Sequence, residues 1–265
     1  MLWIDGNPSA SAEPLDRGLE FGDGLFETIA VRNGAPRLLD AHLARLAAGC
    51  ERLGLSAPPR EQLAADVCAA AATPNTGVVK LILTRGAGGI GYAIDPSRPV
   101  RRYVVATPAR RPAPLAGARV ALLPTPLQPQ GRLVGLKHLN RLEQVLLRRD
   151  AVALGVDEGL VADALGHVIC GTMSNLFVVH GGRVSTPDLA RAGIEGVMRG
   201  ALIAHLAHAG TPVAVRPIGV DELRSADELF LTNALVGVWP ITMLDDRHWK
   251  IGPVSAGLRA AVATW

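Results

Sequence analysis

Lysine is scarce in this 265-residue sequence, since only three of its 27 basic residues are lysine and the rest are arginine. A guanidinium group stays protonated at ordinary pH and cannot serve as a nucleophile or a base, so the few lysines are enriched for positions that need a primary amine. Lys80, in VVKLIL, fits the solvated face of a strand, and Lys250, in DDRHWK, fits the protein surface. Lys137, in GLKHLNR, has apolar and potentially specific neighbours, which makes it the candidate reactive amine.

Cysteine is equally sparse. Cys50, Cys68 and Cys170 are widely scattered, without a C-x-x-C motif or a cluster of cysteine and histidine at metal-ligand spacing. This pattern argues against a disulfide framework and a structural zinc site, and we predict no metal site.

Long apolar runs are absent as well, and the first residues, MLWIDGNPS, lack the basic and apolar regions of a signal peptide. We therefore expect a cytoplasmic protein that makes no contact with a membrane. The net charge is +3, and the arginines are spread along the chain. Nucleic-acid binders usually concentrate their charge on one face, so small anionic ligands are favoured and nucleic acid is not expected.

Residues 84–95, TRGAGGIGYAID, contain the pattern G-x-G-x-x-G directly after the predicted strand VVKLIL. A dinucleotide-binding turn needs a helix immediately after its glycines, because the pyrophosphate sits on the N-terminus of that helix. Pro96 and Pro99 interrupt any helix that begins there. A nucleotide-dependent oxidoreductase is therefore only a remote alternative. Two interpretations stay open: a flexible connection between strands, or a loop in which Arg85 helps to bind an anionic substrate.

Hydrophobic periodicity predicts helices and strands that interleave along the chain. Leu39, Leu43, Leu46 and Leu53 follow the apolar stripe of an amphipathic helix. Other predicted helices cover residues 60–72, 140–154, 197–209, 221–226 and the C-terminus. Predicted strands cover residues 2–6, 26–31, 37–39, 78–85, 102–107, 118–123, 159–163, 167–170, 175–187 as a hairpin, 213–218 and 228–234.

Six prolines lie between Pro108 and Pro129, which makes this stretch the best candidate for a domain boundary. We predict an α+β protein with a small N-terminal domain over residues 1–110 and a Pro-rich interdomain segment over 111–129. A larger C-terminal domain over residues 130–265 would carry Lys137. The strand pairs favour hairpins over crossovers, and the chain has no internal repeat.

Four stretches carry a family resemblance: FGDGLFET (21–28), AHLARL (41–46), LKHLNRLEQVL (136–146) and CGTMSNLFVVHGGRVSTPDLARAGIEGVMR (170–199). In order and spacing they resemble the fold-type IV pyridoxal-phosphate enzymes, which include branched-chain and D-amino-acid aminotransferases and aminodeoxychorismate lyase. RGAGGIGY and KHLNRLEQVL look most like the lyase versions of these segments. The resemblance extends from about Asp5 past Thr232 and implies the two-domain fold of D-amino-acid aminotransferase.

The resemblance assigns roles to individual residues. Lys137 matches the lysine that binds pyridoxal 5'-phosphate covalently and then acts as base and acid at the substrate. Arg45, read alone as a solvated helix residue, matches the family's source of positive charge for the cofactor phosphate. The turn GIEGVMR opens a helix whose first amides would bind that phosphate. The residues expected to complete the phosphate site are Gly196, Val197 and Met198 through their backbone, and Thr232 and Asn233 through their side chains.

Two positions depart from the aminotransferase pattern. Cys170 replaces the glutamate that usually keeps the pyridine nitrogen protonated, and a neutral thiol cannot hold a pyridinium by charge pairing. Leu142 replaces a tyrosine that hydrogen-bonds the phenolic oxygen of the cofactor. Both departures favour a lyase, because the formation of an aromatic product tolerates a weaker electron sink. Cys170 could also merely fill space while another group protonates the nitrogen.

The implied reaction converts 4-amino-4-deoxychorismate to 4-aminobenzoate and pyruvate, a step of folate biosynthesis. Arg85 and Tyr92 would line the substrate entrance, because this substrate has two carboxylates that an arginine can bind. Thr28 matches a position that faces the reacting carbon, although it fits an ordinary strand residue nearly as well. The resemblance further implies a homodimer and functional coupling to aminodeoxychorismate synthase. The nearest alternative is a branched-chain or D-amino-acid aminotransferase of the same fold.

Overall fold

The computed structural model describes residues 1–9, 11–72, 76–108 and 116–265. The chain divides into two compact units: Met1–Arg111 with Leu136–Asn140 form unit 1, and Pro112–Gly135 with Arg141–Trp265 form unit 2. The predicted domain boundaries at residues 110 and 129 stay a prediction. In this division, residues 118–122 belong to unit 2, and the segment that carries Lys137 belongs to unit 1.

Within the described residues, unit 1 is built on an antiparallel sheet with the strand order β2-β1-β6-β5-β3-β4. Its strands are β1 (Leu2–Ile4), β2 (Asn7–Pro8), β3 (Gly24–Arg32), β4 (Ala35–Pro36), β5 (Thr76–Thr84) and β6 (Arg101–Pro108). Its helices are α1 (Arg17–Phe21), α2 (Leu39–Leu53) and α3 (Arg60–Ala71). The predicted helix over 39–53 is confirmed, whereas the strand predicted over 37–39 is wrong. Leu38 there has a φ of 51°, which ends the hairpin and turns the chain into α2.

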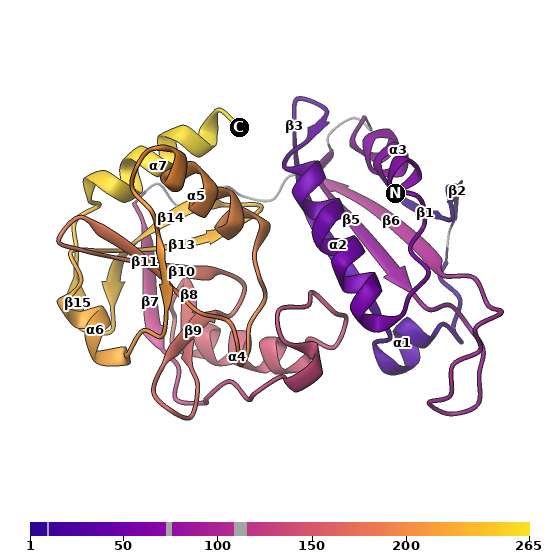
Figure 1. The fold of residues 1–265 in the computed structure, drawn as a ribbon, viewed down its shortest axis with the longest axis horizontal. Coiled ribbons are helices and arrows are strands. Elements are labelled where there is room, and N and C mark those ends of the chain that lie inside the picture. Colours follow the sequence, from indigo (N-terminus) through magenta and orange to yellow (C-terminus); the bar gives the residue numbers. More distant parts are fainter. Residues whose placement is uncertain (10, 73–75, 109–115) are drawn as a thin grey trace. The chain divides into compact units, whose positions relative to one another are not determined.

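The two faces of this sheet differ in burial. Leu25, Ile29, Leu81 and Leu83 are fully buried on the face that α2 and α3 cover (Figure 1). Because side chains alternate along a strand, the residues between them point to the opposite face. That face carries the half-buried side chains of β3 and β5, among them Phe26, Thr28, Lys80 and Ile82.

In its described part, unit 2 is built on a sheet with the order β12-β11-β10-β13-β14-β7-β8-β9, in which β15 also pairs with β14. Its strands are β7 (Ala118–Leu122), β8 (Glu158–Ala162), β9 (Val168–Gly171), β10 (Asn175–His180), β11 (Arg183–Pro187), β12 (Ala214–Arg216), β13 (Glu228–Asn233), β14 (Gly237–Leu244) and β15 (Arg247–His248). Its helices are η1 (Gly131–Leu133), α4 (Leu142–Ala153), α5 (Val197–His208), α6 (Val220–Ser225) and α7 (Pro253–Ala263).

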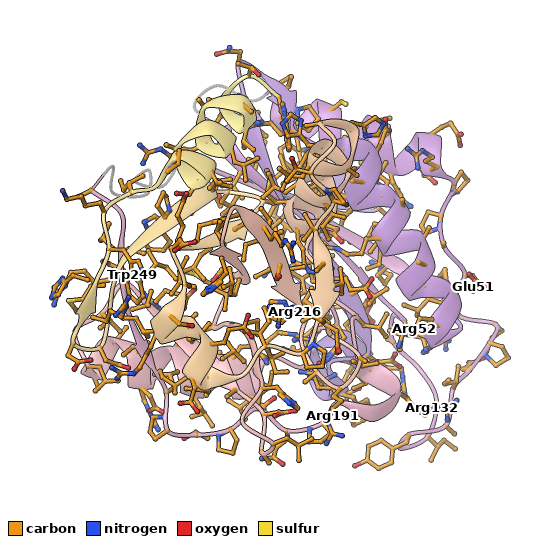
Figure 2. The ribbon with its side chains drawn as sticks, turned by 60° about the vertical axis from the view of Figure 1, so that its left-hand side comes forward. Glu51, Arg52, Arg132, Arg191, Arg216 and Trp249 are labelled. Atoms are coloured by element: carbon orange, nitrogen blue, oxygen red, sulfur yellow. The ribbon has the colours of Figure 1, made fainter. Side chains whose placement is uncertain are left out.

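The core of unit 2 forms where β14 joins its neighbours. Trp239 and Ile241 of β14 pack with Leu229 and Leu231 of β13 in one buried apolar cluster. Trp249, which Figure 2 labels, packs against this cluster. Its indole Nε1 donates to the carbonyl of Ala226 at 2.9 Å. Strand β14 was not predicted from the sequence.

Among the described residues, no helix is long and apolar enough to cross a membrane. The same residues contain no group of histidine, cysteine, aspartate and glutamate that could hold a metal ion.

Candidate active site

Lys137 lies in a short segment that pairs in antiparallel orientation with the beginning of β3. The Phe26 N–H donates to the Lys137 carbonyl at 3.0 Å, and the Leu139 N–H donates to the Gly24 carbonyl at 3.0 Å. A Cβ on Gly24 would lie 2.3 Å from the Leu83 carbonyl oxygen, so only glycine fits between this segment and β5. The GDG of the FGDGLFET motif therefore serves to bring the lysine segment against the sheet.

The side chain of Lys137 lies on the half-buried face of the sheet. Its Nζ is 4.1 Å from the centroid of the Phe26 ring. Thr28 follows two residues later on the same face, directly opposite Lys80 on β5. The Nζ of Lys80 lies 4.9 Å from the centroid of the same ring. Two of the three lysines of the chain therefore meet at one aromatic side chain.

On the opposite face, Arg45 belongs to a buried charged cluster. Arg45 Nε donates to Glu27 Oε1 at 2.8 Å, its Nη2 donates to Oε2, and His42 Nδ1 lies 2.6 Å from Oε2. Burial alone would raise the pKa of Glu27, but the hydrogen bonds from His42 and Arg45 outweigh it, so the pKa is lowered. Arg45 stays a predicted phosphate ligand, and Glu27 holds its guanidinium in place.

Sequence reasoning missed Glu27 and His42. The signal was present in β3, where Glu27 occupies an inward position between Leu25 and Ile29 in an otherwise apolar row. A buried carboxylate requires partners, and His42 and Arg45, spaced i, i+3 on one face of α2, supply them.

The glycine-rich loop of residues 86–93 links antiparallel strands, and no helix follows it before β6. The buried guanidinium of Arg17 organises the loop by donating to carbonyl oxygens of Gly88, Gly91, Tyr92 and Ala93 at 3.0 to 3.4 Å. The loop thus directs carbonyl oxygens at a cation. A dinucleotide-binding loop does the reverse and directs amides at a pyrophosphate, so the structure agrees with setting the oxidoreductase reading aside.

Arg85 and Tyr92 stay predicted substrate residues, and the structure gives each an intramolecular partner. Arg85 donates to Asp23 Oδ2 at 2.8 Å and to the carbonyls of Leu53 and Gly54 at 2.8 and 2.9 Å, where it closes the end of α2. Its side chain is only 10% exposed. Tyr92 is 85% exposed, with its ring edge-on to Phe21. Binding of a substrate by Arg85 would have to compete with these hydrogen bonds.

In unit 2, the predicted phosphate site coincides with the start of α5. Gly196 is the N-cap, and no side chain of the described residues caps this helix. A Cβ on Gly196 would lie 2.1 Å from Asn175 Oδ1. Asn175 is buried and donates from Nδ2 to the Ile194 carbonyl at 3.0 Å, so it has little freedom to move away. Val197 and Met198, the first residues of the helix, thus carry outward amides beside a position that accepts only glycine.

Thr232 and Asn233 lie at the end of β13 and make internal hydrogen bonds. The Thr232 hydroxyl donates to the Gly237 carbonyl at 2.7 Å. Asn233 accepts from the amides of Leu235 and Val236 through Oδ1. Both stay predicted phosphate ligands, although Thr232 could donate to a phosphate only after its hydroxyl rotates.

Cys170 lies on β9 beside a buried carboxylate of unit 2. Burial, and then the negative charge of Glu158, raise the pKa of Cys170 to about 12, so the thiol stays protonated at neutral pH. Glu158 is fully buried and accepts from the Thr172 hydroxyl and amide and from the Ser174 hydroxyl. Burial lowers the pKa of Arg141 to about 10, and the proximity of Cys170 opposes this shift. The thiol of Cys170 therefore lies near a negative charge (Glu158) and a positive charge (Arg141), and it stays neutral. Leu142, the other departure from the aminotransferase pattern, begins α4 and is 71% exposed.

Comparison with known proteins decides the family. Residues 24–244 match the family model described as amino-transferase class IV. The chain belongs to this family. It is 31% identical to an aminodeoxychorismate lyase from Vibrio harveyi over 95% of this chain and 94% of that protein. It is 30% identical to a putative branched-chain-amino-acid aminotransferase from Methanocaldococcus jannaschii, over 94% of this chain and 89% of that protein.

Among solved structures, the fold matches 4-amino-4-deoxychorismate lyase from Pseudomonas aeruginosa with a TM-score of 0.93 and 43% identity. The match covers 100% of this chain and 98% of that one. The resemblance read from the motifs and the predicted fold class are both confirmed.

Enzymes of this family depend on pyridoxal phosphate, and the residues present fit that group. The uncapped start of α5 supplies amides for a phosphate, and the position of Gly196 has no space for a side chain. Lys137 supplies the amine that a covalent attachment requires.

Proposed function

We propose that this chain is a pyridoxal-phosphate-dependent lyase that converts 4-amino-4-deoxychorismate to 4-aminobenzoate and pyruvate. The observation that carries the proposal is the 43% identity to the lyase of Pseudomonas aeruginosa over the full length of the chain. The neutral thiol of Cys170 and the leucine at position 142 support it, because both depart from the aminotransferase pattern.

In this proposal Lys137 performs the proton transfers. When bound, the cofactor would supply an electron-accepting ring. The Lys137 amine takes the proton from the amine-bearing carbon, and the carbon–oxygen bond to the neighbouring enolpyruvyl group breaks. The departing oxygen keeps the electron pair and receives a proton, which Lys137 is placed to return. Aromatisation of the ring drives the reaction, and Thr28 orients the leaving group from the same face of β3.

The remaining residues of the proposed site bind the cofactor and the substrate. The amides of Gly196, Val197 and Met198, with Thr232 and Asn233, are proposed to bind the cofactor phosphate, and Arg45 to balance its charge. Arg85 and Tyr92 are proposed to contact the substrate. We infer also that the enzyme is a cytoplasmic homodimer, coupled to aminodeoxychorismate synthase as the source of its substrate.

The test is chromatographic. Protein loaded with pyridoxal phosphate is supplied with enzymatically generated aminodeoxychorismate, and 4-aminobenzoate is quantified for the wild type, Lys137→Ala and Lys250→Ala. Lys250 is exposed and serves as the matched lysine control. We expect prompt product from the wild type and Lys250→Ala and none above background from Lys137→Ala. Absence of product from loaded wild-type protein would refute the lyase, and conversion of the cofactor to its amine form by branched-chain or D-amino acids would then favour an aminotransferase.

A further inference from the structure

Arg17 is a buried cation that the proposed mechanism does not use. It begins α1, and its side chain is only 6% exposed. Its guanidinium donates to four carbonyl oxygens of the loop of residues 88–93: from Nη1 to Gly88, Gly91 and Ala93 at 3.4, 3.0 and 3.3 Å, and from Nη2 to Tyr92 at 3.3 Å. One side chain thus contacts the backbone of nearly the whole loop.

The backbone of this loop has little other structure to hold it. Residues 88–93 form neither helix nor strand. As far as the structure describes the chain, the loop backbone makes one internal hydrogen bond, from the Ala93 N–H to the Ile90 carbonyl at 3.1 Å. Gly89 has a φ of 91°, and a Cβ there would lie 2.1 Å from the Ala93 carbonyl oxygen and 3.3 Å from Arg17 Nη1. The loop therefore closes tightly around the guanidinium, which satisfies carbonyl groups that a strand would pair in a ladder.

Arg17 also helps to fix the ring of Tyr92, which is assigned to the substrate. The Cζ of Arg17 lies 5.0 Å from the centroid of the Phe21 ring. The Tyr92 ring lies edge-on to this Phe21 ring, with 5.4 Å between the centroids. Tyr92 is nevertheless 85% exposed, so a ligand can reach it. A side chain that is already held in place loses less conformational freedom when it binds a ligand.

Asp23 connects this loop to the segment that carries Lys137. Its Oδ2 accepts from Arg17 Nε at 3.1 Å. The next residue, Gly24, accepts through its carbonyl from the Leu139 N–H at 3.0 Å. The loop and the lysine segment therefore belong to one continuous set of hydrogen bonds inside unit 1, and Arg17 joins the loop to it.

We infer that Arg17 is a positioning residue that holds the loop of residues 88–93 in the conformation that binds substrate. This inference rests on the proposed function, which assigns Tyr92 to the substrate. A loop that is ordered only part of the time weakens the apparent affinity of its ligand by the fraction of time that it is ordered. Arg17 thus lowers the KM of the substrate without touching it. Its effect on kcat is small, because bound substrate orders the loop with or without Arg17.

The experiment compares wild type, Arg17→Ala and Arg102→Ala, each loaded with pyridoxal phosphate, with and without millimolar guanidinium chloride. Arg102 is the matched control, because its side chain is 10% exposed and donates at 2.9 Å to Asp66 on α3 rather than to the loop. Free guanidinium fits the space that the truncated side chain of Arg17→Ala leaves and offers the same planar donors. If Arg17→Ala does not fold, Arg17→Lys gives the same comparison, because it keeps the charge but has fewer donors.

Chymotrypsin reports on the loop directly, because cleavage after Tyr92 requires the loop to open. We expect Arg17→Ala to be cut into residues 1–92 and 93–265 more than about tenfold faster than wild type, as the loss of one hydrogen bond to a charged group predicts. Guanidinium should slow the cleavage of Arg17→Ala and leave the wild-type rate unchanged, and Arg102→Ala should be cut at the wild-type rate. Equal rates in wild type and Arg17→Ala would overturn the inference.

The 4-aminobenzoate assay then reports on substrate binding. We expect Arg17→Ala to raise KM about ten- to a hundredfold and to change kcat less than about threefold. Guanidinium should recover most of this loss, and Arg102→Ala should keep the wild-type KM. The inference is wrong if kcat falls at an unchanged KM, or if guanidinium restores resistance to chymotrypsin without lowering the raised KM. If wild-type protein forms no 4-aminobenzoate, the proposed function fails instead, and the chymotrypsin rates still decide whether Arg17 holds the loop.

Discussion

Replacing Glu27 by glutamine should destabilise unit 1 by removing the buried carboxylate between Arg45 and His42. Glutamine keeps the volume of the side chain, so the substitution leaves no cavity. It removes the charge that Arg45 contacts through two nitrogens and that His42 Nδ1 contacts at 2.6 Å. The glutamine amide would also direct a donor at one of these donors.

The size of this loss in the free energy of unfolding follows from the burial of the two side chains. Glu27 is 1% exposed and Arg45 is 16% exposed, so the guanidinium left behind regains little water. Removal of one partner of a buried ion pair costs about 3–5 kcal/mol, and the partial exposure of Arg45 favours the lower end. With an unfolding entropy of about 2.1 cal/mol/K per residue, 3 kcal/mol lowers Tm by about 12 °C if unit 1 unfolds alone, and by about 5 °C if the whole chain unfolds together.

The assay is urea unfolding followed by circular dichroism between pH 3 and 8, with Glu61→Gln as the control because Glu61 is exposed on α3. The pKa of Glu27 is lowered in the folded protein. Its ionised form therefore stabilises the fold at every pH above the unfolded value of about 4.3, and this contribution is lost as the pH falls through the folded pKa. The gap between wild type and Glu27→Gln should be constant near neutrality and shrink in acid. A gap under about 1 kcal/mol at pH 7, or a gap as large at pH 3 as at pH 7, would refute the reasoning.

Two further predictions concern unit 2. Gly196→Ala should lower stability by about 1–3 kcal/mol, the usual cost of overpacking, and should weaken pyridoxal phosphate binding in a fluorescence titration. Gly200→Ala, on the exposed face of the same helix with nothing within 4 Å of its Cβ, should leave both unchanged or improve stability. Wild-type affinity in Gly196→Ala would place the phosphate elsewhere. Cys170→Glu should shift the absorbance of the bound cofactor and raise transamination of amino acids, with little change in the lyase rate. Cys68→Glu, on an exposed position of α3, is its control, and a large gain in lyase rate without transamination would contradict the view that the lyase tolerates a weak electron sink.

Much of the fold could be predicted because the periodic signals were strong. The stripe from Leu39 to Leu53 is a local pattern, and the structure contains the helix that it predicts. Lys137 could be singled out by the scarcity of lysine and by its motif. Its grouping with unit 1 could not, because that depends on the hydrogen bonds of residues 136–140 to β3, far away in the sequence.

The partners of the arginines were also beyond sequence reasoning. Arg17 attracted no attention as a single residue, yet its buried guanidinium holds four carbonyls of a loop some 70 residues away. Arg85 was assigned to the substrate from its loop, whereas its neighbours Leu53 and Gly54 come from the end of a helix. Every residue has a backbone carbonyl, so the sequence does not show which carbonyl oxygens an arginine binds. In the sequence, an arginine that binds several carbonyls therefore cannot be told from one that binds an anionic ligand.

The different hydrogen-bonding properties of arginine and lysine explain why lysine is scarce in this sequence. A guanidinium presents five donors in a fixed plane, which suits positions where several acceptors converge, and Arg17, Arg45 and Arg85 all occupy such positions. An ammonium gains less from such a frame, but it can lose a proton or follow a moving ligand. We therefore expect arginine at positions with fixed acceptors or at the solvent-exposed surface. We expect lysine where the side chain must take part in chemistry or follow a mobile ligand. Two of the three lysines lie close to Phe26 on one sheet face, and this argument expects Lys137→Arg to lose all activity.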